Sequence, residues 1–221
     1  MTVERVTKVP SAADRQPADR TPDRAAAIES AVLAATEQLL AEGSSFSALS
    51  TQRIAETAGV ARSTLYLYFK GKNALLVRLT SELKGGSFDL MREWSPEAPD
   101  ALDRLADTLL EVIRYYRRRA HVLRAVLELS GRDTEAGRLW DDELGPFQRM
   151  SQDWIQHAQA TGRTAADIDA ATASQVIVHG GIRVITQQAL SGMPEKDVKV
   201  ARELAANQWF GAFRRCNRTQ S

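Results

Sequence analysis

The sequence predicts an all-α protein of about nine helices arranged in two domains. Apolar side chains recur every three or four residues along most of the chain, which is the spacing of one face of an α-helix. No run of alternating β-branched residues bounded by turn residues occurs, so no strand is predicted. No internal repeat is visible either.

The composition favours a globular, cytoplasmic protein. The chain has 221 residues, of which 43% are hydrophobic and 26% are charged. No stretch approaches the roughly 20 apolar residues that span a bilayer, so no membrane contact is expected. The polar N-terminus lacks the apolar core of a signal peptide. Because Cys216 is the only cysteine, an intrachain disulfide is impossible, which also favours the cytoplasm.

Four helices are predicted in the N-terminal part of the chain. They follow residues 1–22, a polar segment with three prolines that we expect to be a disordered tail. Ser50 is suited to cap the second helix, and Gly59 separates the second from the third. The pair Gly85-Gly86 is a candidate kink in the fourth. The helices cover Ile28 to Leu39, Thr51 to Ala58, residues 61–68 and Lys72 to Trp94.

Five further helices are predicted in the C-terminal part. The pair Gly145-Pro146 is a candidate kink in the third of them. Gly192 and Pro194 separate the last two. The five helices cover Leu102 to Tyr116, Val122 to Leu129, Leu139 to Gly162, Asp167 to Leu190 and Glu195 to Arg215.

Residues 51–72 meet the requirements of a helix-turn-helix, in which two short helices cross closely. Ala55 supplies the small residue at the crossing, and Gly59 tolerates the left-handed backbone of the turn. Apolar residues occupy the core positions, and polar or aromatic residues face outward from the second helix. The core group is Ile54, Ala58, Val60 and Leu65, and the outward group is Arg62, Ser63, Thr64, Tyr66 and Tyr68. The pattern predicts a DNA-binding domain.

The local charge agrees with this prediction. The net charge of the whole chain is +1, whereas residues 44–73 carry four basic side chains and one acidic side chain. This segment therefore has a charge of +3, and the rest of the chain sums to −2. A small cationic patch is enough for DNA where the geometry focuses it.

Two other basic segments allow alternative interpretations. The N-terminal tail is either disordered or an arm whose Arg15, Arg20 and Arg24 touch DNA beside the folded domain. A second basic run is interpreted as the solvated end of a helix, with contact to DNA or to an anionic ligand as the alternative. This run is Arg114, Arg117, Arg118 and Arg119.

The segment after the turn resembles the TetR family of helix-turn-helix repressors. The family has an aromatic stretch, then basic residues and a hydrophobic helix start, which read here Leu65-Tyr66-Leu67-Tyr68-Phe69-Lys70-Gly71-Lys72-Asn73-Ala74-Leu75-Leu76. The resemblance covers about residues 25–80, and the rest agrees only in helix number and length. It implies a DNA-binding domain over residues 23–71 and a ligand-binding and dimerisation domain over residues 72–221.

The resemblance also implies which residues touch double-stranded DNA. Arg62 is the candidate for a bidentate contact with guanine, and Lys72 is expected to bind phosphate at the next helix N-terminus. The Tyr66 ring either packs or reaches out, and Lys70 is either a phosphate contact or an ordinary solvated lysine. The expected DNA-contacting residues are Thr51, Gln52, Arg62, Ser63, Thr64, Tyr66, Tyr68, Lys70 and Lys72.

Aromatic and thioether side chains concentrate in the central helices, as suits an adaptable apolar pocket. Each of them is otherwise an ordinary core residue. His179 is either a satisfied core or interface histidine, or a polar anchor for a ligand carbonyl or carboxylate. The candidate ligand-binding residues are Trp94, Tyr115, Tyr116, Trp140, Phe147, Met150, Trp154 and His179.

The resemblance places the interface of a homodimer on the last two helices, Asp167 to Leu190 and Glu195 to Arg215. The pair Gly180-Gly181 costs helix propensity, about 1 kcal/mol for each glycine, but allows close helix contact. The candidate interface residues are Gly180, Gly181, Trp209, Phe210 and Phe213. A dimer would present two recognition helices to a palindromic operator.

Together these features predict a repressor whose DNA affinity falls when a small apolar or aromatic inducer binds the C-terminal domain. A DNA-binding protein without an inducer and an activator are the alternatives. An enzyme is not predicted, because the sequence has no phosphate loop, nucleophile elbow or metal-ligand spacing. We expect no cofactor and no metal.

Overall fold

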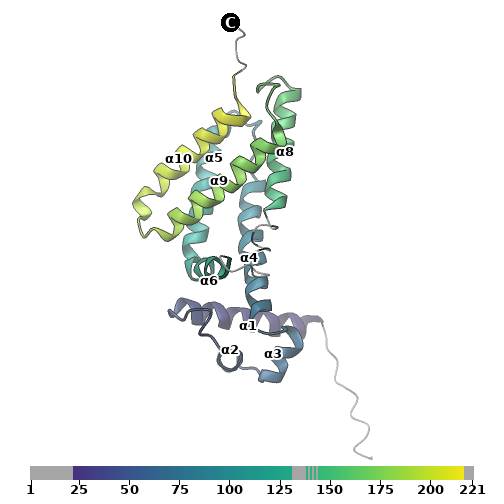
Figure 1. Cartoon of the computed structure of the whole chain (residues 1–221), viewed down its shortest axis with the longest axis vertical. Coiled ribbons are helices and arrows are strands. Elements are labelled where there is room, and N and C mark those ends of the chain that lie inside the picture. The colour runs from purple at the N-terminus through teal and green to yellow at the C-terminus, as the bar shows by residue number, and fades with distance from the viewer. Residues whose placement is uncertain (1–21, 131–137, 139, 141, 143, 217–221) are drawn as a thin grey trace, which may run out of the picture.

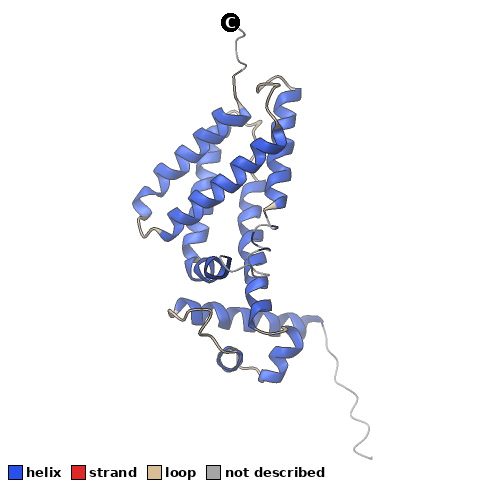
Figure 2. Ribbon diagram, viewed as in Figure 1, coloured by secondary structure: helices blue, strands red, loops and turns tan. Residues whose placement is uncertain are grey.

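The computed structural model describes residues 22–130, 138, 140, 142 and 144–216, and all the regular structure in these residues is helical (Figure 2). This confirms the predicted all-α class. The tail predicted over residues 1–22 lies, apart from Pro22, outside the described residues. The α-helices are α1 (Pro22–Ala41), α2 (Thr51–Thr57), α3 (Arg62–Tyr68), α4 (Lys72–Arg92), α5 (Ala101–Arg118), α6 (Ala120–Ser130), α8 (Gly145–Ala160), α9 (Ala170–Leu190) and α10 (Asp197–Gln208).

The molecule is elongated, with α1 to α3 at one end and the larger helical body at the other (Figure 1). Helix α4 runs lengthwise from the first group into the second. Helix α6 packs against both α1 and α4 and so lies at the junction of the two groups. No helix among the described residues is both long and apolar enough to cross a membrane.

The three-helix end is built on a short cap, a glycine turn and a small apolar core. The Ser50 hydroxyl accepts a hydrogen bond from the Arg53 amide at 3.2 Å, which caps α2 as expected. Gly59 has a φ of 68°, which lets the chain turn between α2 and α3. Ile54 and Leu65 are fully buried on either side of this turn. The packing therefore fixes how α3 is presented to the outside.

Helix α4 is continuous through Gly85-Gly86, so the glycine pair does not end the helix. The reason for the second glycine is a close crossing. A Cβ atom on Gly86 would overlap the hydroxyl group of Tyr115 on α5, whereas one on Gly85 would meet no atom within 4 Å. Gly86 thus lets Tyr115 of α5 approach α4 closely.

Two predictions about the C-terminal helices are wrong. The pair Gly145-Pro146 begins α8 rather than kinking a longer helix, because proline suits the first turn of a helix. The last helix is not continuous: a 3₁₀ turn (Pro194–Lys196) precedes α10, and a π turn (Trp209–Phe213) follows it. Residues 139, 141 and 143 at the start of that predicted helix lie outside the described part, as do residues 131–137 before it.

The second basic run is not simply a solvated helix end, because two of its arginines are engaged. Arg117 forms an ion pair with Asp197 and donates hydrogen bonds to the carbonyls of Gln188 and Ala189, at the end of α9. Arg119 forms an ion pair with Glu37 on α1. Arg119 therefore joins the larger body to the three-helix end.

Candidate DNA-binding surface and ligand cavity

Helix α3 has one buried face and one exposed face. Leu65 is fully buried in the apolar core, which holds the helix in place. Arg62, Ser63 and Tyr66 are exposed on the outer side, while Thr64 is half-buried. Leu67 is 67% exposed. The outer face of α3 is therefore free to enter a DNA groove.

Three predicted DNA-contacting residues form one hydrogen-bonded group on this face. The hydroxyl groups of Tyr66 and Thr51 lie 3.1 Å apart, and Arg62 Nη2 donates a long, 3.5 Å hydrogen bond to the Tyr66 hydroxyl. The Arg62 guanidinium also lies 5.5 Å from the centre of the Tyr66 ring. The hydrogen bond with Thr51, followed by that from Arg62, lowers the pKa of Tyr66 from its ordinary value. The group pre-arranges two donors and a ring on the outer face.

The remaining predicted contacts differ in exposure. Gln52 is exposed and donates a 2.6 Å hydrogen bond to Glu56, one turn later on α2. Tyr68 is half-buried and packs against the core, so its ring is partly a structural element. Lys70 is exposed just after α3.

Lys72 has a structural role that the sequence did not predict. Its ammonium group donates hydrogen bonds to the carbonyl oxygens of Phe46, Ser47 and Leu49, at 3.2, 2.7 and 3.2 Å. These carbonyls belong to the loop between α1 and α2. Lys72 therefore ties this loop to the start of α4, and its contact with phosphate stays a prediction.

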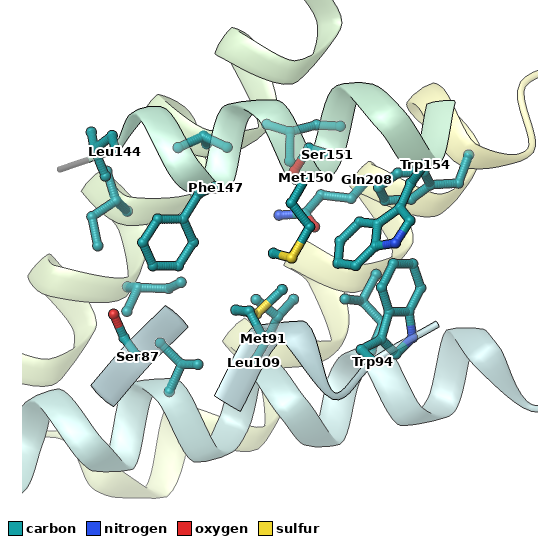
Figure 3. Close-up of a pocket in the computed structure, with 18 of the residues that line it drawn as sticks. Ser87, Met91, Trp94, Leu109, Leu144, Phe147, Met150, Ser151, Trp154 and Gln208 are labelled. Atoms are coloured by element: carbon teal, nitrogen blue, oxygen red, sulfur yellow. The ribbon is translucent and has the colours of Figure 1, made fainter. Parts of the chain in front are cut away.

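The larger body contains a mostly apolar cavity between α4, α5, α8, α9 and the end of α10 (Figure 3). Five of the eight predicted ligand residues line it, namely Trp94, Tyr116, Phe147, Met150 and Trp154. Trp94 stacks edge to face on Trp154, with 4.8 Å between ring centres. No charged residue occurs among the described residues that line the cavity.

Three predicted ligand residues do not line this cavity. Tyr115 turns toward α4, where its hydroxyl donates to the carbonyl of Glu82. Trp140 packs on Tyr116, and the buried ammonium of Lys84 lies 3.5 Å from the centre of its ring. His179 is exposed and contacts Gln148 at 2.7 Å. Helical periodicity alone could not distinguish the two sides of these helices.

The cavity also contains polar groups that sequence reasoning missed. The Ser87 hydroxyl lies 2.9 Å from the hydroxyl of Tyr116, and burial raises the pKa of Tyr116, which keeps the phenol neutral. Ser151 and Gln208 line the cavity as well. Serine and glutamine within amphipathic helices carry no pattern that separates a pocket wall from a solvated face, so no sequence signal marked them.

The empty part of the cavity measures about 60 Å³. A buried water needs roughly 10–15 Å³ on this measure, so a few waters fit. Pockets for drug-sized ligands reach roughly 300–1,000 Å³. A ligand of that size would enter only if side chains such as Met91 and Met150, which are flexible thioethers in the cavity wall, moved aside.

The predicted dimer residues divide into an outer and an inner set. Gly180 and Phe210 are exposed, and Phe210 is 61% exposed. Gly181 is buried in the cavity wall, and Phe213 is buried against Trp94, with 5.3 Å between the ring centres. Gly181 and Phe213 were predicted at the dimer interface, and this is corrected here, since packing within the chain already covers both. Trp209 is half-buried beneath Arg214.

Several apolar side chains are exposed on α9 and α10. Val176 and Val184 are 68% and 39% exposed and lie two turns apart on α9, with Gly180 between them. Val198 on α10 is 42% exposed. Exposed apolar patches of this kind mark protein interfaces.

These observations define a helix-turn-helix DNA-binding protein with a helical C-terminal domain that encloses a cavity. Residues 32–79 match the family described as bacterial regulatory proteins, tetR family. The match covers the helix-turn-helix and the start of α4, so it identifies a TetR-type DNA-binding domain in this chain. The resemblance noted in the sequence is thereby confirmed.

Solved structures share the fold over most of the chain. GusR from Salmonella enterica is 21% identical with a TM-score of 0.69, covering 86% of this chain and 96% of that chain. The fatty acid degradation regulator FadR from Bacillus halodurans is 22% identical with a TM-score of 0.66, covering 82% and 98%. FadR from Bacillus subtilis in complex with stearoyl-CoA is 21% identical with a TM-score of 0.66, covering 81% and 96%. No curated protein matches the chain significantly.

Proposed function

We propose that the chain is a homodimeric transcriptional repressor whose affinity for a palindromic operator falls when a small, mostly apolar ligand enters the C-terminal cavity. One observation carries the proposal. Helix α4 begins beside the helix-turn-helix, where Lys72 holds the loop before α2, and further along the same helix Ser87 and Met91 form part of the cavity wall. A single rigid element therefore contacts both sites.

The size of the cavity supports a change of shape on binding. Because the empty space is only about 60 Å³, most ligands would displace Met91 or its neighbours and so push on α4. Motion of α4 would shift α3 in each protomer. Two recognition helices read successive major grooves only when they are about 34–36 Å apart, so a small tilt lowers DNA affinity.

The apolar outer face of α9 and α10 supports dimerisation through these helices. A two-fold axis there would pair Val176, Val184 and Phe210 with the same residues of a second copy and bury them. Four helices, two from each copy, would then pack as a bundle. The two DNA-binding ends would point the same way.

The test is a fluorescence-polarisation titration against DNA that flanks the protein's own gene, at two salt concentrations. We expect Arg62→Ala to weaken binding about tenfold or more, because one base contact is worth about 1–3 kcal/mol. Arg104→Ala is the matched control, since Arg104 is an exposed arginine on α5, in the larger body. Equal loss in both variants, or no binding to any genomic fragment, would contradict the proposed DNA surface.

Two alternatives give different outcomes. A regulator without an inducer would bind operator DNA with an affinity that no bound ligand changes, and an activator would raise transcription in a reconstituted assay. The cavity and its polar groups favour the ligand-controlled form, because a domain with only a structural role has no need of buried polar side chains facing empty space.

A further inference from the structure

The cavity holds two polar side chains that are almost completely buried and face its empty space. Gln208 is 9% exposed and Ser151 is 5% exposed, and both line the cavity. Among the described residues, neither side chain has a hydrogen-bond partner, although Ser87 and Tyr116 on another wall satisfy each other. Figure 3 shows the Gln208 amide reaching into the cavity beside Met150, with Ser151 on the neighbouring helix α8.

A ligand that displaces water from these two groups must replace the hydrogen bonds that the water can make. An amide or hydroxyl group that is buried without a hydrogen bond destabilises a protein, so buried polar groups are nearly always paired. A glutamine amide offers an N–H donor and a C=O acceptor side by side, and a serine hydroxyl can donate or accept. A ligand amide, which also carries a donor next to an acceptor, uses both the N–H and the C=O of the glutamine as well as the serine hydroxyl.

The chain is shaped locally to bring this amide into the cavity. Gly181 on α9 faces Gln208, and a Cβ atom there would come within 3.3 Å of Gln208 Nε2. The glycine thus leaves room for the amide. Gln208 also ends α10, directly before the π turn.

The π turn places a second side chain in the same cavity. Phe213 follows Gln208 by five positions. In a regular α-helix, with 100° per residue, two such residues lie about 140° apart around the axis and so face different directions. Here the amide of Arg214 bonds to the carbonyl of Trp209, five residues back, at 2.7 Å, which widens the turn. As a result Phe213 lines the cavity together with Gln208.

The charge of the lining decides which molecules fit. None of the described lining residues is a lysine, arginine or histidine, so a carboxylate or phosphate in the cavity would lack a cationic partner there. The buried ammonium of Lys84 lies over Trp140 and does not line the cavity. Burying an unpaired anion costs far more than burying a paired amide.

We propose that the cavity binds an uncharged, mostly apolar molecule carrying one amide-like group, whose N–H and C=O pair with Gln208 and Ser151. The proposal rests on the proposed function, because it names the ligand class of the same cavity. It sets this chain apart from a regulator that takes an acidic lipid or a coenzyme A thioester.

The test is isothermal titration calorimetry on the full chain without DNA, using probes of equal size. One series is octanamide, octanoate and 2-nonanone, and the second is 3-phenylpropanamide, 3-phenylpropanoate and 4-phenyl-2-butanone. In at least one series we expect the amide to bind about tenfold more tightly than the carboxylate and the ketone, the ratio for one satisfied donor–acceptor pair. A carboxylate that binds as tightly as the amide, or no amide binding at millimolar concentration, overturns the proposal.

Variants assign the effect to the two side chains. We expect Gln208→Leu to weaken amide binding about tenfold and to leave ketone binding within about threefold. Gly181→Ala should weaken amide binding in the same direction, by displacing the Gln208 amide. Gln156→Leu on the exposed face of α8 is the control and should change nothing. Unchanged amide binding in Gln208→Leu overturns the proposal.

Ser151→Ala provides a second readout if Gln208→Leu folds poorly, because it removes a single oxygen atom; unchanged amide affinity in this variant also overturns the proposal. A polarisation titration with operator DNA separates the two claims. If the amide binds but leaves DNA affinity unchanged, the proposed induction fails and the ligand class stands. If octanoate binds the protein more tightly and releases the DNA, the ligand class fails and the induction stands.

Discussion

Lys70 and Lys72 lie two residues apart after the recognition helix, but their surroundings differ. Lys70 is exposed, whereas Lys72 donates hydrogen bonds to three backbone carbonyls of the loop between α1 and α2. The family pattern identified both positions as basic and could not distinguish a tether from a phosphate contact. That distinction depends on where the loop carbonyls point, which is a tertiary property.

Exchange of each lysine for methionine separates these roles. We expect Lys72→Met to lower the free energy of unfolding by about 1–3 kcal/mol, because charged hydrogen bonds to the loop are lost. We expect Lys70→Met to keep stability and to reduce the slope of log K against log salt by about 0.9, as for one lost phosphate contact. Urea unfolding and polarisation at several salt concentrations measure both quantities. A Lys72→Met protein of unchanged stability would contradict the tether.

If Tyr66 contacts DNA as predicted, we expect DNA binding to be sensitive to alkaline pH. The hydrogen bond with Thr51 and then that from Arg62 lower its pKa, so the phenol ionises at a lower pH than an ordinary tyrosine. The phenolate would repel DNA phosphates, so affinity should fall as the pH rises through this pKa. Polarisation titrations from pH 7 upward measure the effect, and Tyr66→Phe should remove it. An identical pH profile in Tyr66→Phe would count against a DNA contact by this hydroxyl.

At the level of elements, the adjacent glycines of α4 look alike in the sequence but differ in their packing against other helices. Both interrupt the apolar pattern in the same way, and the sequence suggested a kink. In the structure the helix is continuous through both, but only Gly86 meets another helix, at Tyr115. The Tyr115 hydroxyl is held there by the carbonyl of Glu82 and by Arg119, each at 3.2 Å.

The two glycines should therefore respond oppositely to alanine. Gly85→Ala should raise the free energy of unfolding by about 0.5–1 kcal/mol, since nothing lies within 4 Å and alanine favours the helix. Gly86→Ala should lower it by about 1–3 kcal/mol, because the Tyr115 ring must move and lose its hydrogen bonds. Urea unfolding of both variants measures the difference. Equal changes in the free energy of unfolding would show that Tyr115 does not pack closely on Gly86 where α4 and α5 cross.

The helix boundaries that were predicted wrongly share a physical cause. Gly145-Pro146 is compatible with either a kink or a helix start, and the choice depends on what precedes it in space. The π turn at Trp209–Phe213 has no sequence signature of its own. It ends with Phe213 buried against Trp94, a contact with a residue far away in the sequence.

At the level of the whole molecule, dimerisation through α9 and α10 makes a clear prediction. Phe210→Asp should weaken the dimer about a hundredfold or more, because a two-fold interface loses one buried ring from each copy. Analytical ultracentrifugation measures the dimer constant. Leu67→Asp is the matched control, since Leu67 is a similarly exposed apolar residue on α3. A Phe210→Asp protein that remains as dimeric as the control would rule out this face.

The ion pair between Arg119 and Glu37 joins the two ends of each protomer, and Arg119 also lies 3.9 Å from Glu82 on α4. We expect Arg119→Met to reduce the effect of a saturating ligand on DNA affinity by about threefold or more, with ligand affinity unchanged. Arg118→Met is the control, because Arg118 is exposed. The ratio of DNA dissociation constants with and without ligand is the measurement. An unchanged ratio would mean that α4 alone carries the coupling.

The sequence by itself determined the all-α class, the helix-turn-helix and the family of its DNA-binding domain. These depend on short-range periodicity, a cap and a turn glycine, all of which are local properties of the chain. Only the tertiary structure decided which helix faces enclose the cavity, that Lys72 holds a loop, and that Gln208 and Ser151 turn inward. An amphipathic helix shows which side is apolar, but whether a residue on that side meets core, cavity or a second copy depends on helices far away in sequence.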